Sequence, residues 1–156
     1  MNHNVFNEGK YMTLNEVAFM VDFVDSFGKY AGKIWAAFNT NGSLTENKLM
    51  EKTGLTEKEL YSAIGWLAKE NKIYKETGDG SFSLGDTNLT TKIGNDAGIV
   101  WKILDMWGEV DVESISQLAK INENDVFCAV GWLVREGKLD GKTTEHNTNN
   151  FLFWLK

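Results

Sequence analysis

The chain has few of the side chains that perform covalent or metal chemistry. Its 156 residues include one cysteine, Cys128, and two histidines, His3 and His146. A disulfide or a cysteine-based zinc site needs more cysteines, and a transition-metal site needs more imidazole or thiolate ligands. The sequence also lacks a glycine-rich phosphate loop and a His-Glu-x-x-His motif. We therefore expect no catalytic residue, no metal and no cofactor, and the chain is predicted not to be an enzyme.

Cys128 is the strongest nucleophile that the sequence offers. A reactive cysteine needs a nearby cation that favours the thiolate, and no basic residue is adjacent to Cys128 in the sequence. We expect a structural thiol, and the alternative is an exposed, reactive one. Carboxylate pairs such as Glu57 and Glu59 lie at predicted helix starts, where negative charge favours the helix dipole without any catalytic task.

The composition predicts a folded protein rather than a disordered or membrane-bound one. Apolar residues make up 42% of the chain and aromatic residues 12%, which is enough to build a core. The longest apolar run, from Val17 to Val24, contains Asp22 and is too short to cross a bilayer. The N-terminus also lacks the basic and apolar regions of a signal peptide. We expect a cytoplasmic protein with no membrane partner and no small-molecule substrate.

The sequence repeats itself once, with an offset of 66 residues. AGKIW at residues 31–35 corresponds to AGIVW at 97–101, and AIGWL at 63–67 corresponds to AVGWL at 129–133. The core-type positions in between match apolar with apolar. Two copies of so long a repeat indicate two duplicated globular units rather than a solenoid, which needs at least three repeats.

Each unit predicts three short helices followed by a β-hairpin. In the first unit, Thr45 is the expected N-cap of the second helix, and Thr56 with Glu59 has the capping-box spacing at the start of the third. The elements expected in the first unit are a helix that ends near 39–42, helices 46–52 and 57–71, and strands 72–76 and 81–84. The second unit repeats this order and ends with strands 138–144 and 151–155 around an Asn-rich tip.

This order of elements is that of a winged helix-turn-helix domain. The predicted fold is therefore α+β, mainly α, with winged-helix units at residues 27–92 and 93–156. Residues 1–26 are expected to form a tail and an extra N-terminal helix, which opens with a capping box at Thr13 to Glu16. Its predicted apolar face comprises Leu14, Val17, Ala18, Val21 and Val24. We expect the units to be related by a pseudo-twofold axis or by a translation and to pack on that helix.

The two repeated motifs also resemble a known family. Ala-Gly-x-x-Trp in the first helix, with Ala-Ile-Gly-Trp-Leu-Ala-Lys-Glu-Asn-Lys-Ile at the end of the third, is similar to a family of small bacterial and archaeal winged-helix proteins of uncharacterised function. The similarity covers residues 28–75 and 94–140, and members of that family are usually single units. The resemblance implies the winged-helix fold and no particular function.

The third helix of a DNA-binding winged helix enters the major groove. Here its early positions are acidic, with Glu57 and Glu59 in the first unit and Glu123 and Asp125 in the second, and a phosphate backbone repels them. The first unit has nine lysines and eight acidic residues, whereas the second has six basic and ten acidic residues. If either unit touches nucleic acid, it is therefore the first. Its possible nucleic-acid contacts are Lys58, Ser62, Lys69, Lys72 and Lys75, and the alternative is that the lysines form a solvated face.

A glycine lies in the middle of each third helix, at Gly65 and Gly131. The helical period places Gly65 on the outward face, opposite the apolar stripe. Because a mid-helix glycine costs about 1 kcal/mol relative to alanine, two of them indicate that another backbone approaches closely. That backbone could belong to the other unit, to the N-terminal helix or to a partner; alternatively, each glycine makes room for the neighbouring tryptophan. The predicted interaction face comprises Tyr61, Gly65, Phe127, Gly131 and Trp154.

Most of the tryptophans are expected in the core rather than on a surface that stacks nucleic-acid bases. The expected core tryptophans are Trp35, Trp66, Trp101 and Trp132. Trp107 and Trp154 have no aromatic counterpart in the first unit. Residues 151–155 are apolar on both faces of their expected strand, so we expect the second wing to be covered on both faces. The cover could be the first unit, the N-terminal helix or a second copy of the chain.

Two classes of function are favoured over an enzyme. The first is a non-catalytic protein-interaction module, a compact acidic adaptor that recognises another protein or a second copy of itself. The second is a DNA-binding transcriptional regulator that acts through the first unit, which the order of elements favours and the acidic third helices oppose. We rank the interaction module first because the net charge of −6 and the acidic third helices both disfavour a nucleic-acid partner.

Overall fold

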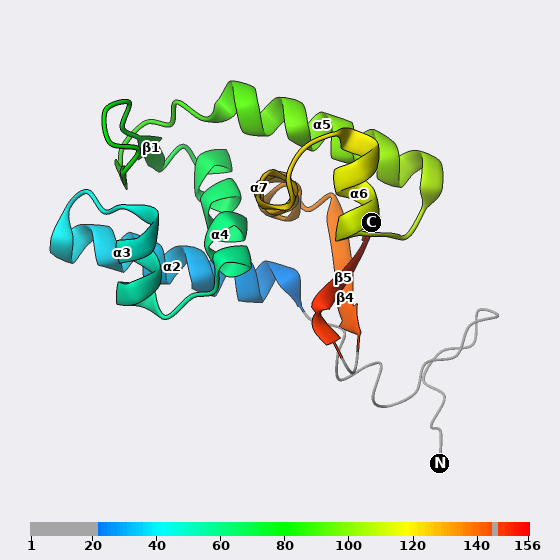
Figure 1. The fold of residues 1–156 in the computed structure, drawn as a ribbon, viewed down its shortest axis with the longest axis horizontal. Coiled ribbons are helices and arrows are strands. Elements are labelled where there is room, and N and C mark those ends of the chain that lie inside the picture. Colours follow the sequence, from blue (N-terminus) through cyan, green and yellow to red (C-terminus); the bar gives the residue numbers. More distant parts are fainter. Residues whose placement is uncertain (1–21, 145–146) are drawn as a thin grey trace, which may run out of the picture.

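The computed structural model describes residues 22–144 and 147–156, which form two units of the same design (Figure 1). The first contains α2 (Phe23–Asn41), α3 (Glu46–Thr53), α4 (Glu57–Lys69), β1 (Ile73–Lys75) and β2 (Phe82–Leu84). The second contains α5 (Thr90–Trp107), β3 (Val110–Asp111), α6 (Val112–Ala119), α7 (Glu123–Arg135), β4 (Leu139–Thr144) and β5 (Asn147–Leu155). The fold is therefore α+β, mainly α, with two tandem winged helix-turn-helix units, as the sequence predicts.

Side-chain caps begin the second and third helices at the predicted residues. The hydroxyl of Thr45 accepts a hydrogen bond from the backbone of α3 at 3.3 Å. Thr56 and Glu59 form a full capping box, in which Thr56 accepts from the Glu59 N–H at 3.3 Å and Glu59 accepts from the Thr56 N–H at 2.9 Å. Asn122 caps α7, and its side-chain oxygen accepts a hydrogen bond from the Asp125 N–H at 2.8 Å. Each cap satisfies N–H groups that the helix leaves free, and so fixes where the helix begins.

The two wings differ in size. In the first, β1 and β2 pair antiparallel, with Ile73 opposite Leu84. In the second, β5 lies between β3 and β4 in a three-stranded sheet. Strand β5 begins at Asn147 rather than at residue 151, because Asn147 pairs with Thr144 and extends the hairpin into the predicted Asn-rich tip. Backbone pairing needs no apolar side chain, so the alternation pattern did not mark this extension. Residues 145–146 of the tip lie outside the described residues.

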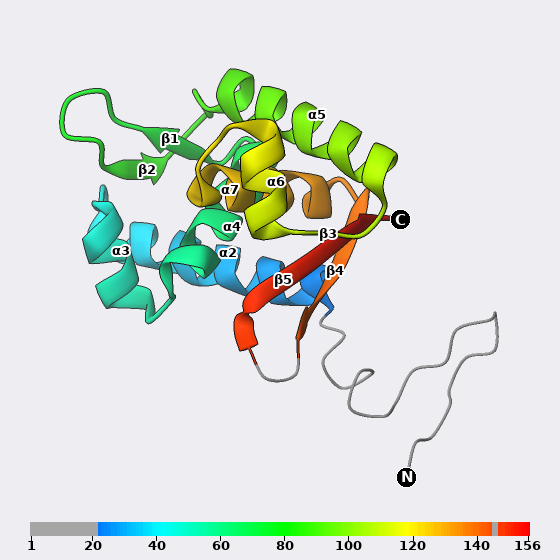
Figure 2. The same cartoon turned by 45° about the vertical axis from the view of Figure 1, so that its right-hand side comes forward.

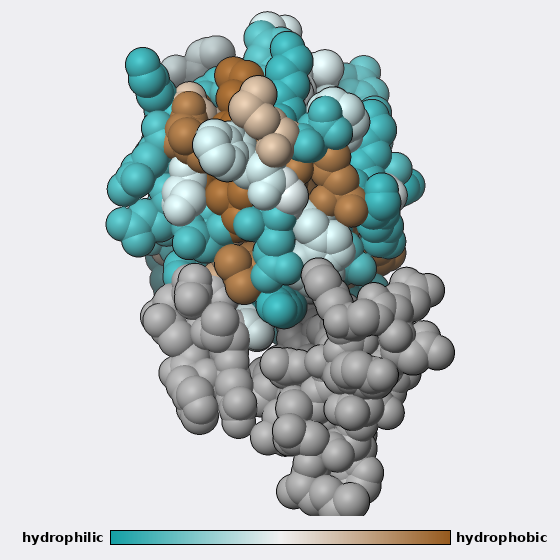
Figure 3. Space-filling model, turned by 90° about the vertical axis from the view of Figure 1, so that its right-hand side faces the viewer, coloured by the Kyte–Doolittle hydropathy of each residue, from teal (hydrophilic) through white to brown (hydrophobic). Residues whose placement is uncertain are grey.

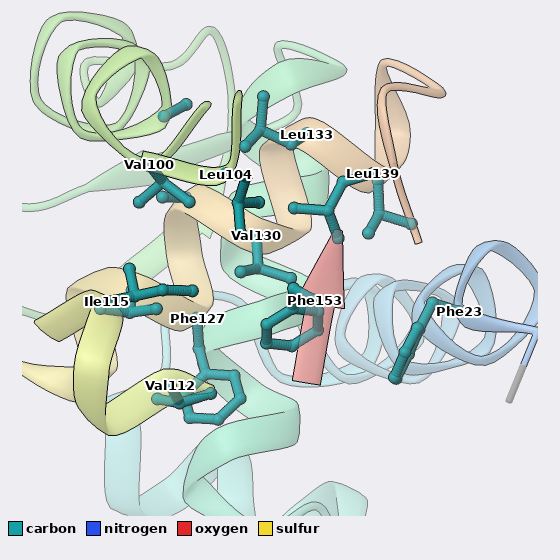
Figure 4. Close-up of a cluster of buried hydrophobic side chains, with 14 of the residues drawn as sticks. Phe23, Val100, Leu104, Val112, Ile115, Phe127, Val130, Leu133, Leu139 and Phe153 are labelled. Atoms are coloured by element: carbon teal, nitrogen blue, oxygen red, sulfur yellow. The ribbon is translucent and has the colours of Figure 1, made fainter. Parts of the chain in front are cut away.

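Each unit has its own core, but the two cores exchange residues at their boundary. Phe23 and Phe27 of α2 pack into the core of the second unit. Ile93 and Cys128 of the second unit pack into the core of the first. Figure 4 shows Phe23 beside Phe153 of β5, and the centroids of these two rings are 5.7 Å apart. The two units are therefore joined by shared apolar contacts and are not separate domains connected only by a linker.

The first unit begins before the predicted boundary at residue 27. Helix α2 begins at Phe23 and is capped by Asp22. Val24, predicted above to belong to a separate N-terminal helix, instead lies in α2 and is exposed. The rest of that predicted helix and the predicted tail lie outside the described residues. None of the helices in the described part of the chain is long and apolar enough to cross a bilayer.

Candidate interaction site

The third helices of the two units, α4 and α7, pack against one another at the centre of the molecule (Figure 1, Figure 2). The contact is closest at Gly65 and Gly131. A Cβ atom on Gly65 would collide with the carbonyl oxygen of Cys128, and one on Gly131 would collide with the carbonyl oxygen of Ser62. The backbone that approaches each glycine is therefore that of the other unit. Only glycine, which has no Cβ atom, lets two backbones come so close.

The contact is reciprocal at the far end of the two helices as well. Lys69 lies 3.7 Å from Glu136, and its repeat counterpart Arg135 lies 3.1 Å from Glu70. Each of these cations also lies over a tryptophan ring of the opposite helix, at 5.0 Å and 5.4 Å from the ring centroid. Equivalent residues exchanging equivalent contacts define an isologous interface. The units are therefore related by a pseudo-twofold rotation and not by a translation.

The residues of the predicted interaction face lie at two places. Gly65, Phe127 and Gly131 are buried, and Tyr61 beside them is half-buried. Trp154 lies apart from them, half-buried on β5. The glycine positions of this face are occupied by the contact between the two units of one chain. A partner therefore finds them already covered.

The five residues named as possible nucleic-acid contacts do not form one surface. Ser62 is buried, and its hydroxyl donates to the carbonyl oxygen of Lys58 at 2.8 Å. Lys58 lies in the first turn of α4, whereas Lys69 lies at the other end and faces the second unit. Lys72 and Lys75 are exposed at the first wing. The expected positive surface is divided because the outward face of α4 packs on α7.

A cavity of about 430 Å³ lies beside the contact between the units. Its walls include five aromatic rings from α2, α7 and β5, namely Phe23, Phe27, Tyr30, Phe127 and Phe151. Helix α4 contributes its first turn, and the ammonium group of Lys58 lies 5.5 Å from the ring centroid of Phe151. The sequence alone gave no sign of this cavity, because its walls come from both units and meet only in the folded chain.

The polar groups around this cavity are engaged with one another. Burial and a hydrogen bond to Glu59 raise the pKa of Tyr30 from the ordinary value of 10.0 to about 12. Glu57 accepts a hydrogen bond from the side chain of Asn124 at 2.6 Å, which links the two units. An aromatic cavity with such paired polar groups suits an apolar side chain or ligand better than acid–base catalysis.

The pseudo-twofold places an ion cluster where the cavity has tyrosine and glutamate. The repeat counterparts of Tyr30 and Glu59 are Asp96 and Asp125. Lys92 donates to Asp96 at 2.5 Å and to Asp125 at 3.2 Å. Asp96 is buried, so this pairing offsets the cost of removing its charge from water. One side of the α4–α7 interface thus has an aromatic cavity, and the equivalent place on the other side has the ion cluster of Lys92, Asp96 and Asp125.

Cys128 is buried next to this cluster. Burial raises the pKa of its thiol well above the ordinary value, and the nearby carboxylates of Asp125 and Asp96 act in the same direction. The side chain is therefore a thiol at neutral pH and a poor nucleophile. Within the part of the chain that the structure describes, no group of three or more His, Cys, Asp or Glu side chains is placed to hold a metal ion.

Each unit also carries a shallow groove lined by the repeated tryptophans. Trp35 and Trp66 line the first groove, and Trp101 and Trp132 line the second. Trp35 and Trp101 are 47% and 38% exposed, so the prediction that they lie in the core is wrong. Trp35 follows the fully buried Ile34, and one helical step of about 100° turns it out of the core stripe. Trp66 and Trp132 are half-buried.

Comparison with known proteins agrees with this architecture. The family described as Winged helix-turn-helix domain (DUF2582) matches the chain twice, at residues 20–85 and at residues 88–153. Neither a curated protein nor a solved structure matches the chain. The two matches span most of the chain and coincide with the two observed units. The chain therefore belongs to this family of winged helix-turn-helix proteins and contains two of its domains in tandem.

Proposed function

We propose that the chain is a non-catalytic, cytoplasmic protein-interaction module, a regulatory adaptor that binds another protein rather than DNA. The observation that carries the proposal is the packing of α4 on α7. The outward face of a third helix is the surface that a DNA-binding winged helix presents to the major groove. In both units the glycine on this face lies against the backbone of the other unit, so neither helix can offer that face to a duplex.

The charge distribution supports the same proposal. The second unit has six basic and ten acidic residues, and the first turn of each third helix carries two carboxylates. Phosphate contacts need an excess of cations, and the lysine that α4 keeps at its end is turned towards Glu136. We therefore expect the surfaces that bind a protein partner to be apolar or acidic rather than basic.

One observation favours the second candidate, a DNA-binding transcriptional regulator that acts through the first unit. Lys72 and Lys75 are exposed at the first wing, where some winged helices contact phosphates or the minor groove. Lys72 lies 3.7 Å from Glu70, and the ammonium group of Lys75 lies 5.6 Å from the ring centroid of Phe82. Two such lysines would support weak contact with the phosphate backbone of DNA rather than recognition of a base sequence.

The test compares DNA binding and protein binding by the full chain. Fluorescence anisotropy with a random-sequence duplex, at low and at moderate salt, is expected to show no binding. A tagged chain is also used to capture partners from a lysate of its source cells, with and without nuclease. The expected result is a specific protein whose capture survives nuclease. Micromolar, salt-sensitive duplex binding that is lost in Lys72→Glu/Lys75→Glu would overturn the proposal in favour of the regulator.

A further inference from the structure

The second unit exposes large apolar side chains where α5 meets α6. Met106 is 76% exposed, Trp107 62% and Leu118 49%, and Ile99 is also exposed. We call these four residues the α5–α6 face. Figure 3 views the side of the molecule on which α6 and the end of α5 lie, and apolar residues gather there among hydrophilic ones. A group of exposed apolar side chains with a polar rim is typical of a binding surface.

The first unit provides an internal comparison, because its framework is the same. The counterparts of the α5–α6 face in the first unit, at the offset of 66 residues, are all polar: Lys33, Thr40, Asn41 and Lys52. These four residues line one shallow hollow between α2 and α3, so the four positions are neighbours on the surface. The framework itself does not need apolar residues there. Their presence in the second unit therefore serves something other than folding.

The segment that surrounds the α5–α6 face has more acidic than basic residues, and we call these acidic residues its acidic rim. Residues 99–120, which span the α5–α6 face, contain four acidic residues and two lysines; the acidic residues are Asp105, Glu109, Asp111 and Glu113, and the lysines are Lys102 and Lys120. The matching residues 33–54 of the first unit contain two glutamates and three lysines. Glu109 is 3.6 Å from Lys142, which offsets only part of the charge. The second unit thus has more apolar surface and more negative charge than the first at the same place, and this combination attracts a cationic, apolar partner.

We propose that the α5–α6 face binds a cationic amphipathic helix of a partner protein. The apolar side chains of that helix would cover Met106, Trp107 and Leu118, and its lysines or arginines would meet the acidic rim. An amphipathic helix that lays its apolar face on an apolar surface is a recurring mode of recognition. The inference rests on the proposed function, and it adds the surface and the chemistry of the partner.

Two other occupants fit the face less well. A second copy of the chain, packed face to face, would bring one acidic rim against another, which like charges oppose. Residues 1–21 of the chain itself contain one lysine and two glutamates, so they offer no excess of positive charge. Charge therefore selects a basic partner segment over both.

The probes are three dye-labelled peptides of about 18 residues, a length that forms several helical turns. The first has leucine at the i, i+3, i+4 and i+7 spacing and lysine elsewhere. The second replaces every lysine by glutamate, and the third has the composition of the first in an order without a helical apolar face. Titration of each with the full chain by fluorescence anisotropy is expected to show that the first binds at least about tenfold more tightly than either control.

A matched pair of variants locates the site. Met106→Thr/Trp107→Asn/Leu118→Lys installs the residues of the first unit on the second, and all three positions are exposed, so the fold is expected to persist. We expect this variant to bind the first peptide at least about tenfold more weakly. The control variant Thr40→Ala/Asn41→Ala alters the equivalent surface of the first unit and should bind as the wild type does. Circular dichroism confirms that both variants are folded.

Equal binding of the three peptides, or unchanged binding by the triple variant, would overturn the inference. The same preparations are titrated with the random-sequence duplex, so that the two proposals can fail separately. If the chain binds neither the peptides nor the duplex, the α5–α6 face is rejected as a binding site and the proposed function stays in place. Micromolar, salt-sensitive duplex binding that is lost in Lys72→Glu/Lys75→Glu rejects the proposed function, while the peptide titration of the triple variant still decides whether the face is a site.

Discussion

Gly65 of α4 and Gly131 of α7 occupy equivalent repeat positions, and each faces the backbone of the other's helix. This relationship makes each unit the cover for the other. A single unit would leave its glycine face open to solvent, whereas the tandem chain closes two such faces in one contact. The duplication therefore places within one chain an interface of the isologous kind that otherwise joins two copies in a homodimer.

Replacing Gly131 by leucine is expected to destabilise the fold strongly. Its Cβ would collide with the backbone carbonyl of Ser62, which cannot move aside as a side-chain end can. Overpacking of this kind costs about 1–3 kcal/mol, and a collision with backbone belongs at the upper end. Urea unfolding followed by circular dichroism measures the change in the free energy of unfolding.

Gly98 provides the matched control, because it is also a mid-helix glycine. A Cβ atom at Gly98 would meet nothing within 4 Å. Gly98→Ala should therefore stabilise the chain by about 0.5–1 kcal/mol, through the higher helix propensity of alanine. If Gly131→Leu were as stable as the wild type, the close α4–α7 contact would have to be abandoned.

Stability is expected to fall as the pH rises from 10 to 12. An unfolded tyrosine has a pKa of 10.0, whereas burial and the hydrogen bond to Glu59 raise the pKa of folded Tyr30 to about 12. Between these values the folded state holds a proton that the unfolded state has lost, so each rise in pH favours unfolding. Below pH 10 this contribution to stability is fully present. Urea unfolding at several pH values measures the slope, which should be smaller in Tyr30→Phe; an identical slope would contradict the assignment.

Cys128 is expected to resist thiol reagents in the folded protein. It is buried, and the pKa of its thiol is raised by burial, so little thiolate is present at neutral pH. An absorbance assay with a disulfide reagent should detect one thiol in denaturant and almost none in buffer over the same time. The variant Leu118→Cys, which adds an exposed thiol, should react at once and serves as the control. Rapid labelling of Cys128 in the native protein would show that the α4–α7 contact opens readily.

Much of the fold could be predicted because its signals are local. The capping box of Thr56 and Glu59, the N-cap Thr45 and the alternation in the first wing each depend on residues close together in the chain, and each is found where it was predicted. The 66-residue repeat then identified two units of one kind. The edge of a buried helix face is harder to predict, because neighbouring residues differ by one helical step of about 100°. The prediction that Trp35 and Trp101 lie in the core is therefore wrong, since each directly follows a core residue but points outward.

The site depended on contacts that no local pattern records. The helical period placed Gly65 on an outward face, and Lys58, Ser62 and Lys69 of the same helix were possible nucleic-acid contacts. Those residue types suit a nucleic-acid surface and a helix contact equally well. Likewise, the aromatic cavity needs α2 of one unit and β5 of the other, which lie far apart in the chain. Only the folded chain shows which of the possible partners each face has.

The two winged-helix units, their order, their caps and the excess of negative charge in the second unit can all be predicted from the amino-acid sequence. Short-range hydrogen bonds and hydrophobic periodicity decide these features, and both can be read along the chain. The packing of the third helices on each other through Gly65 and Gly131, which divides the lysines and leaves the α5–α6 face exposed, is visible only in the folded chain. The reason is that the approach of two backbones depends on the position of every element between them, and the residue types of one face do not specify that position.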